Sequence, residues 1–163
     1  MRFVFVACLA ALLAGCASER PLLPYETPLP KTQFQQVRTT AYTDTESDHL
    51  PYGNHTALGT TLSYGPVKSA AADWSRWPAG TVFRILETGE TYQVDDYGWD
   101  LAGRNTIDLY KPSRSEMNNW GLRHVTIQIL QWGDPGYSFH FLEPHARYPH
   151  IRRMLLEFEG KPV

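Results

Sequence analysis

From Gln36 onward the chain is a series of short β-type runs separated by glycine and proline, and this pattern constrains the fold most strongly. The run at residues 37–43 alternates and is rich in threonine and tyrosine, which is typical of a half-buried strand. Further strands are expected at residues 81–86, 92–94, 106–110 and 125–130, with turns at Gly53, Gly59, Gly65, Gly80, Gly89 and Gly98. Many short strands with few helices predict a mainly β domain, either a small barrel or a sandwich.

Two segments carry helical signals. Residues 113–116, Ser-Arg-Ser-Glu, form a capping box ahead of a turn or two that ends at Gly121. Residues 149–159 begin with a proline, carry an apolar stripe at helical spacing and precede a glycine. Short helices are therefore expected at these two places.

The N-terminus has the pattern of an export signal. Arg2 gives a positive start, residues 3–13 are uncharged and apolar, and the small residues at 14–15 precede Cys16. This run is shorter than the roughly 20 apolar residues of a spanning helix. The Leu-Ala-Gly-Cys sequence resembles the bacterial lipobox, which implies a signal peptide over residues 1–15 and lipidation of Cys16. An ordinary cleaved signal with an incidental cysteine is the alternative.

The residues after Cys16 indicate where the protein is held. Ala-Ser at 17–18 resembles the pattern sorted to an outer membrane, so a lipoprotein facing the periplasm is expected. Residues 21–30 contain four of the 12 prolines and almost no charge, which predicts an unfolded tether over residues 16–33. The folded domain is expected at residues 34–133, followed by a C-terminal extension with a short helix at residues 134–163.

Cysteine content and charge exclude several functions. The 2 Cys, Cys8 and Cys16, both lie in the targeting segment. The domain therefore has no disulfide, no thiolate metal site and no cysteine nucleophile. The formal net charge of −2 lacks the basic surplus that nucleic-acid binding requires, so nucleic acid is not expected as a partner.

Three acidic segments occur in order along the middle of the chain. They are Ser-Ala-Ala-Ala-Asp at 69–73, Tyr-Gln-Val-Asp-Asp-Tyr-Gly at 92–98 and Gly-Arg-Asn-Thr-Ile-Asp-Leu-Tyr at 103–110. Thr-Ala-Tyr-Thr at 40–43 precedes them, and Trp-Gly-Leu-Arg-His-Val at 120–125 follows. Over about residues 37–132 this order resembles the three-aspartate (3D) domain of peptidoglycan lytic transglycosylases. That family includes the catalytic part of membrane-bound lytic murein transglycosylase A and small stationary-phase muralytic proteins.

The resemblance implies a six-stranded double-psi β-barrel with its aspartates in a groove. It also implies cleavage of peptidoglycan glycan strands between N-acetylmuramic acid and N-acetylglucosamine, without a metal or cofactor. Asp73, Asp96 and Asp108 take the three named positions, and Asp108 corresponds to the catalytic acid. The residues expected to bind substrate are Thr40, Tyr42, Tyr97, Gly98 and Tyr110.

Three departures from the family pattern bear on activity. Tyr97 stands where the family usually has threonine. One extra residue lies between Gly103 and Asp108. Asp95 precedes Asp96, so Asp95 is a rival for the second aspartate position.

Strand alternation gives a second, independent reason to single out Asp108. In the strand expected at residues 106–110, Ile107 and Leu109 share one face and Asp108 lies on the other. The apolar pair suits the core, so the carboxylate should face a polar groove. The alternative is that Asp108 caps a turn or pairs with Arg104 or Arg123.

The reaction that the resemblance implies needs only one acid. Hydrolytic glycosidases use two carboxylates, whereas here the muramic acid's own 6-hydroxyl attacks and closes a 1,6-anhydro ring. An aspartic acid donates a proton at neutral pH only when burial or a nearby carboxylate raises its pKa. Asp96, brought alongside by strand pairing, is expected to have this effect on Asp108, with Asp73 orienting groups.

Two other clusters are less informative. His140, His145 and His150 recur every five residues, which matches neither a helix face nor a strand face. They are expected to be surface or packing residues rather than metal ligands. The acidic loop at residues 44–48 lacks the glycine and later glutamate of an EF-hand, so a solvated loop is expected.

Aromatic residues and two rival functions complete the sequence picture. The tryptophans that flank the aspartate segments are Trp74, Trp77, Trp99 and Trp120. Core packing is favoured for each of them, and a glycan subsite is the alternative for one or two.

The rival functions are a non-catalytic, expansin-like wall-binding barrel and a structural lipoprotein that binds a protein through residues 133–163. Three aspartates in family order favour the enzyme.

Overall fold

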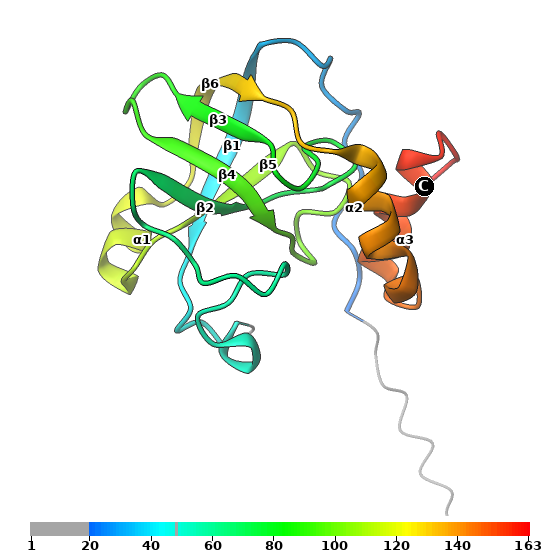
Figure 1. Cartoon of the computed structure of the whole chain (residues 1–163), viewed down its shortest axis with the longest axis horizontal. Helices are drawn as coiled ribbons and strands as arrows, with labels where there is room; N and C mark the ends of the chain where they lie inside the picture. Colours follow the sequence, from blue (N-terminus) through cyan, green and yellow to red (C-terminus); the bar gives the residue numbers. More distant parts are fainter. Residues whose placement is uncertain (1–19, 48) are drawn as a thin grey trace, which may run out of the picture.

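Six strands close into a barrel in the computed structural model, which describes residues 20–47 and 49–163. The strands are β1 (Phe34–Tyr42), β2 (Val67–Ala71), β3 (Val82–Ile85), β4 (Thr91–Asp96), β5 (Thr106–Tyr110) and β6 (Arg123–Gln131). Their order around the barrel is β1-β5-β2-β4-β3-β6, and β6 pairs with β1 to close it (Figure 1). The prediction of a mainly β, six-stranded barrel is confirmed.

The barrel mixes parallel and antiparallel pairs. β1 pairs with β5 and β2 pairs with β4 in parallel, whereas the other four pairs are antiparallel. Sequence patterns predicted every strand except β2. Its small Ser69, Ala70 and Ala71 lack apolar alternation and have low β-propensity, so packing between β4 and β5 makes this segment a strand.

Inward-facing side chains from all six strands fill the barrel. The buried members include Val37, Ala70, Phe83, Ile85, Tyr92, Val94, Ile107, Leu109 and Ile127. The rings of Phe83 and Tyr92 stack with their centroids 5.7 Å apart. In β5 the alternation is as predicted, because Ile107 and Leu109 are fully buried and Asp108 between them is partly exposed.

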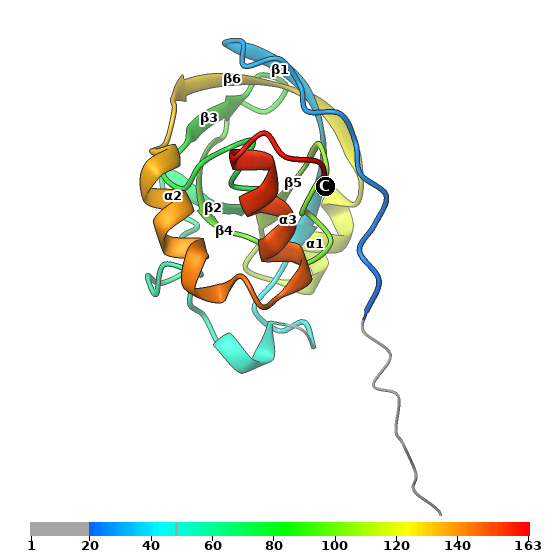
Figure 2. The ribbon, with the colours of Figure 1, turned by 90° about the vertical axis from the view of Figure 1, so that its right-hand side faces the viewer.

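Three short α-helices and two 3₁₀ turns surround the barrel. They are α1 (Arg114–Trp120), α2 (Pro135–Leu142), α3 (Pro149–Phe158), η1 (Leu50–Tyr52) and η2 (Glu143–His145). α2 and α3 lie side by side at one end of the barrel, and α1 lies at the other (Figures 1 and 2). α1 begins as the capping box predicts, since the backbone amide of Glu116 donates to Ser113 Oγ over 3.2 Å. α3 is the second predicted helix.

α2 is a helix that the sequence interpretation missed. It begins after Asp134, whose carboxylate accepts hydrogen bonds from the backbone amides of Gly136 and Tyr137. Pro135 occupies the first helical position, where the missing amide hydrogen costs nothing. Asp-Pro is therefore an N-terminal helix signal that could have been recognised.

Residues 20–33 contain no helix or strand, yet they pack against the barrel. The Glu26 carboxylate lies 2.8 Å from Arg38 and 2.9 Å from Arg104, and it accepts a 2.7 Å hydrogen bond from the backbone amide of Asn105. The expectation of an unfolded tether is wrong for this part, because one acid meets two arginines that are distant in sequence. The signal peptide at residues 1–15 and the lipidated Cys16 lie outside the described residues.

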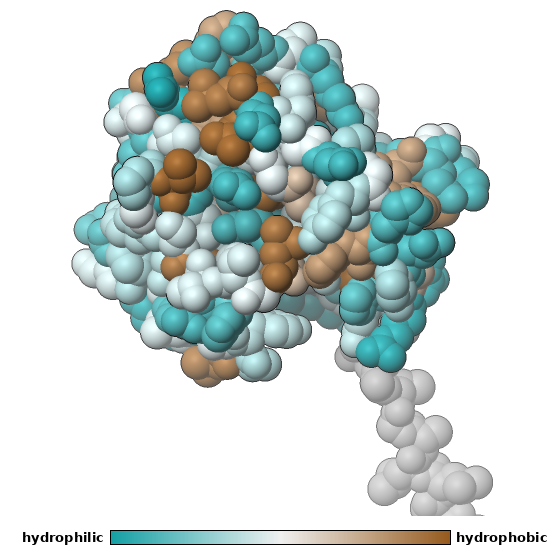
Figure 3. Space-filling model, in the orientation of Figure 1, coloured by the Kyte–Doolittle hydropathy of each residue, from teal (hydrophilic) through white to brown (hydrophobic). Residues whose placement is uncertain are grey.

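The surface shows no broad apolar face on the side seen in Figure 3. Apolar residues form several separate patches there, surrounded by hydrophilic ones. Within residues 20–47 and 49–163, no helix has the length and apolarity to cross a membrane. The concave regions are therefore the better candidates for a functional site.

Candidate active site

A concavity of about 840 Å³ between described residues, which we call the main groove, is the larger of two considered as candidate sites. η1 bounds one side and the segment between α2 and α3 bounds another, and both lie on the lower side of the barrel in Figure 2. Six of the predicted site residues line this groove: Thr40, Tyr42, Asp96, Tyr97, Gly98 and Asp108. The structure thus gathers segments up to 68 residues apart along the chain.

Strand register explains why these residues meet. Thr40 of β1 pairs with Asp108 of β5, Asp108 pairs with Ala71 of β2, and Ala71 pairs with Asp96 of β4. The four residues form one row across adjacent strands. Neighbouring strands are about 4.8 Å apart, so the backbones of Asp108 and Asp96 are separated by roughly 10 Å. The small Ala71 between them leaves the space above the row open.

A bulge selects Asp96 over Asp95. The pairing of β2 with β4 passes from Ala70–Val94 to Ala71–Asp96 and skips Asp95. A bulge of this kind re-aims side chains next to functional sites. Asp96 consequently faces the main groove with Asp108, whereas Asp95 faces a different pocket.

Asp108 is positioned by a hydroxyl on the neighbouring strand. Thr40 Oγ1 donates a 2.8 Å hydrogen bond to Asp108 Oδ1. The two arginines that the sequence suggested as partners also contact other groups. Arg104 lies 2.9 Å from Glu26, and Arg123 donates to the backbone oxygen of Trp120.

Asp96 is more deeply buried than Asp108, with only 7% of its surface exposed. Its Oδ1 accepts hydrogen bonds from the backbone amides of Ala57 at 3.1 Å and Tyr97 at 2.9 Å, and its Oδ2 accepts one from Tyr42 Oη at 3.4 Å. Burial raises the pKa of Asp96 to about 7, against the lowering effect of these hydrogen bonds. β2 separates β4 from β5, so the expectation that strand pairing brings Asp96 directly alongside Asp108 is wrong.

Asp73 does not join the other two carboxylates. It is fully buried behind the groove, where it accepts hydrogen bonds from the Ser75 hydroxyl and backbone amide and from the backbone amide of Gly103. Burial, together with the negative charge of Glu157, raises its pKa to about 6. The predicted convergence of three carboxylates is therefore wrong for Asp73, which instead ties the turn after β2 to the turn before β5.

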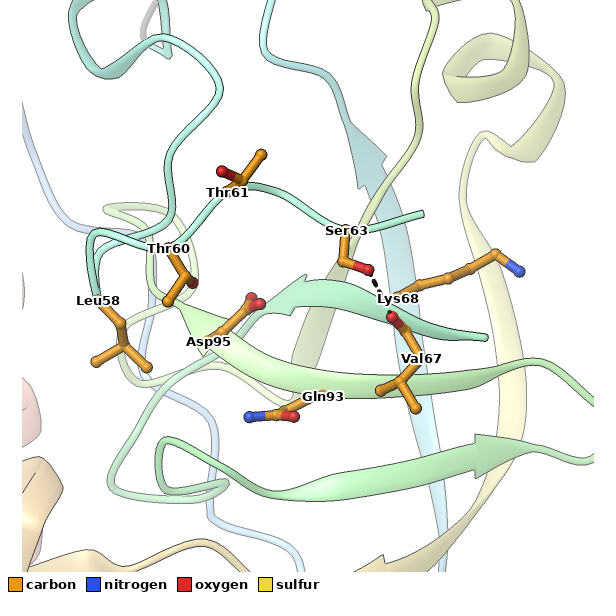
Figure 4. A pocket seen from close by; sticks show the side chains of 8 residues that line it. All are labelled: Leu58, Thr60, Thr61, Ser63, Val67, Lys68, Gln93 and Asp95. Atoms are coloured by element: carbon orange, nitrogen blue, oxygen red, sulfur yellow. Dashed lines mark hydrogen bonds between the residues drawn. The ribbon is translucent and has the colours of Figure 1, made fainter. Parts of the chain in front are cut away.

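Asp95 belongs to a second pocket of about 300 Å³, shown in Figure 4. Half of its lining side chains carry a hydroxyl or amide group, namely Thr60, Thr61, Ser63 and Gln93. Ser69 Oγ donates a 2.6 Å hydrogen bond to Asp95, and burial raises the pKa of Asp95 to about 6. The rivalry between Asp95 and Asp96 therefore reduces to which pocket holds the chemistry, and of the two residues only Asp96 shares a pocket with Asp108.

Three tyrosines were predicted to bind substrate, and they lie in different surroundings. The Tyr42 hydroxyl donates to Asp96, and burial raises the pKa of Tyr42 well above its usual value, with Asp96, Asp95 and Asp108 adding to the effect. Tyr97 lines the groove and meets Trp74 edge-on at 5.0 Å between centroids. Tyr110 packs against Tyr42 at 5.7 Å and does not line the groove.

The tryptophans and histidines separate into core and groove residues. Trp74, Trp77 and Trp120 are buried in the core, whereas Trp99 lines the main groove. His145 and His150 also line it, although they come from the C-terminal extension. No group of acids, cysteines and histidines in the described part of the chain could hold a metal ion.

No family model matches the chain. The chain is 33% identical over 95 residues to the cell wall-binding protein YocH of Bacillus subtilis (strain 168). The match covers 58% of this chain and 31% of YocH, so the chain spans less than a third of that relative's length.

Proposed function

We propose that the main groove binds peptidoglycan glycan strands and cleaves them by lytic transglycosylation, with Asp108 as the single acid and base. The observation that carries this proposal is the row of Thr40, Asp108, Ala71 and Asp96 across four neighbouring strands. It places two carboxylates of the groove, those of Asp96 and Asp108, in different environments. The similarity to a protein named for cell-wall binding supports the same substrate.

The proposed reaction follows from this arrangement. Asp108 donates its proton to the glycosidic oxygen while the bond from that oxygen to the muramic acid C1 breaks. The 6-hydroxyl oxygen of the same sugar attacks C1, and its proton passes to Asp108. One glycosidic bond is broken, one intramolecular ether is formed and the acid is restored, so no water or cofactor is consumed.

The other two aspartates have supporting roles in this scheme. Asp96 has a pKa of about 7, so it keeps a proton near neutral pH and limits the negative charge of the groove. Asp96 also accepts hydrogen bonds from the backbone amides of Ala57 and Tyr97, and these bonds hold the two segments beside the groove. Asp73 fixes Gly103 and hence the start of the segment that leads into β5.

Membership of the three-aspartate family and a double-psi topology are part of the same proposal. The order of the aspartate segments supports them, together with two parallel strand pairs whose members are far apart in sequence. The chain departs from the family pattern at Tyr97 and Asp95. Tyr97 lies in the main groove, and Asp95 lies outside it.

A lipid anchor on Cys16 would place the groove next to the wall. The Leu-Ala-Gly-Cys sequence supports a lipoprotein, and Ala-Ser at 17–18 supports its sorting to an outer membrane, facing the periplasm. Replacing Cys16 with alanine should move the protein from the membrane fraction to the soluble fraction. Retention of Cys16→Ala on membranes after carbonate washing would contradict the anchor.

Non-catalytic wall binding is the second candidate, and the name of the similar protein favours it. A binder would sediment with purified peptidoglycan and release no sugar fragments. Expansin-like binding also predicts that Asp108→Asn leaves sedimentation unchanged. The two candidates therefore differ in products rather than in affinity.

The deciding experiment is digestion of purified peptidoglycan followed by mass spectrometry of the released ends. The wild-type protein should release 1,6-anhydro-muramic ends, and Asp108→Asn should fold normally and lose about 10²–10⁴-fold in rate. Asp95→Asn is the matched control, because Asp95 faces the second pocket, and it should keep most of the activity. Cleavage by Asp108→Asn at the wild-type rate would refute the assignment, and reducing ends without the anhydro ring would mean hydrolysis instead.

A further inference from the structure

We propose that Trp99, Tyr148 and His150 form an aromatic subsite that stacks on a sugar ring of the bound glycan. This inference rests on the proposed function, because it assumes that the main groove receives a glycan. It assigns a role to the C-terminal extension, which lies outside the segment that resembles the three-aspartate family. All three residues line the main groove together with Asp96 and Asp108.

The rings are close enough to form one surface. The His150 ring lies 4.7 Å from the Trp99 ring and 6.0 Å from the Tyr148 ring, centroid to centroid. Tyr97, next to Asp96 in sequence, lies 6.0 Å from His150 on the same side. The aromatic surface thus continues from Asp96, in the row of four residues across the strands, to the C-terminal extension.

His150 behaves as a neutral aromatic ring at physiological pH. Burial, together with the positive charge of Arg20, lowers its pKa to about 4. A neutral imidazole beside an indole presents an apolar face. The hydrogens on one face of a pyranose are also apolar, so stacking removes apolar surface from water on both partners.

The subsite is held in place by both ends of the domain. Ile151, which follows His150, is fully buried at the start of α3. Arg153 of the same helix donates to the backbone oxygens of Leu23 and Ala102. Trp99 Nε1 lies 3.4 Å from the Pro21 oxygen. Rings fixed in this way lose little conformational entropy when a ligand binds.

Polar groups around the rings suit a neutral, hydroxylated ligand better than a charged one. Arg20 and Asp100 form an ion pair of 2.5 Å at the rim, so their charges compensate each other. The Tyr148 hydroxyl accepts a hydrogen bond from Arg147. The Tyr148 residue as a whole is 40% exposed. A sugar offers both an apolar face for the rings and hydroxyls for this rim.

The test measures binding of N-acetylglucosamine oligosaccharides to the full chain carrying Asp108→Asn, which prevents cleavage. Trp99→Ala and His150→Ala in that background should each weaken binding about 3- to 10-fold by calorimetry, as loss of an aromatic contact does. His150→Phe keeps a ring and should bind within about 2-fold of the parent. Trp132→Ala removes an exposed tryptophan outside the groove and serves as the control.

The outcomes separate the subsite from the proposed function. If the Asp108→Asn parent binds the oligosaccharide and Trp99→Ala binds equally well, the subsite is refuted while the glycan groove stands. If the parent binds no oligosaccharide or peptidoglycan fragment, the proposed function itself fails. Circular dichroism of each variant establishes that the barrel remains folded, and Tyr148→Ala provides an exposed position whose change cannot disturb the core.

Discussion

Replacing Asp96 with asparagine should stabilise the barrel, and the gain should grow with pH. Asp96 has a pKa of about 7 in the folded chain against an ordinary value of 3.8, because burial disfavours its charged form. The folded state therefore holds a proton that the unfolded chain releases. Stability is highest below about pH 4 and falls as pH rises toward about pH 7, because ionising the buried carboxyl then opposes folding.

The magnitude follows from the size of the shift. A difference of about 3 pKa units corresponds to about 4 kcal/mol once Asp96 is fully ionised. Roughly 1–2 kcal/mol of this loss of folding stability has already occurred at about pH 5. A further loss of about 2–3 kcal/mol is therefore expected between pH 5 and pH 8. Asparagine keeps the oxygen that accepts from the Ala57 and Tyr97 amides, and it removes the ionisation.

The assay is urea unfolding of the wild type and Asp96→Asn at about pH 5 and pH 8. The difference in unfolding free energy between the two proteins should increase by about 2–3 kcal/mol at the higher pH. The contribution of Asp73 is the same in both proteins and cancels, whereas Asp95 interacts electrostatically with Asp96, so a small part of the difference comes from Asp95. A difference that stays constant with pH, or that shrinks as pH rises, would refute the burial argument.

Three further predictions test the surroundings of the groove. Asp73→Ala should lower the unfolding free energy by about 2–4 kcal/mol in urea titrations, because it leaves the buried Ser75 and Gly103 amides without their acceptor; an effect below about 0.5 kcal/mol would contradict this role. His150→Phe should resist acid unfolding better than the wild type, since the pKa of His150 is lowered and the wild type loses stability as pH falls from about 6.5 toward about 4; identical acid midpoints would contradict it. Gly103→Ala should cost more stability than Gly89→Ala, because both glycines have a positive φ but only at Gly103 does an added Cβ come within 2.8 Å of a neighbouring side chain; equal melting temperatures would count against this.

The strands with apolar alternation could be predicted from sequence because alternation directly reports which face is buried. Asp108 is the clearest case, since Ile107 and Leu109 fix the orientation of β5. The bulge between Ala70 and Ala71 could not be read in this way. It depends on the pairing of β2 with β4, and it decides that Asp96 rather than Asp95 faces the groove.

Other features escaped prediction because they are set by tertiary contacts. The burial of Asp73 requires the amide of Gly103, which is 30 residues away. The docking of residues 20–33 depends on Arg38 and Arg104 reaching Glu26. The extension contributes aromatic side chains to the main groove only because α3 packs against the barrel. The five-residue spacing between the histidines does not predict this packing.

The row of Thr40, Asp108, Ala71 and Asp96 also determines at which stage of folding the main groove is complete. Its members come from β1, β2, β4 and β5, and the Thr40–Asp108 bond alone spans 68 residues. Contacts with such large sequence separation require loop closure before they stabilise anything, so they form late and together. A partially synthesised or unfolded chain has no such row. Under the proposed function, a wall-cutting activity would therefore be absent until barrel closure was complete.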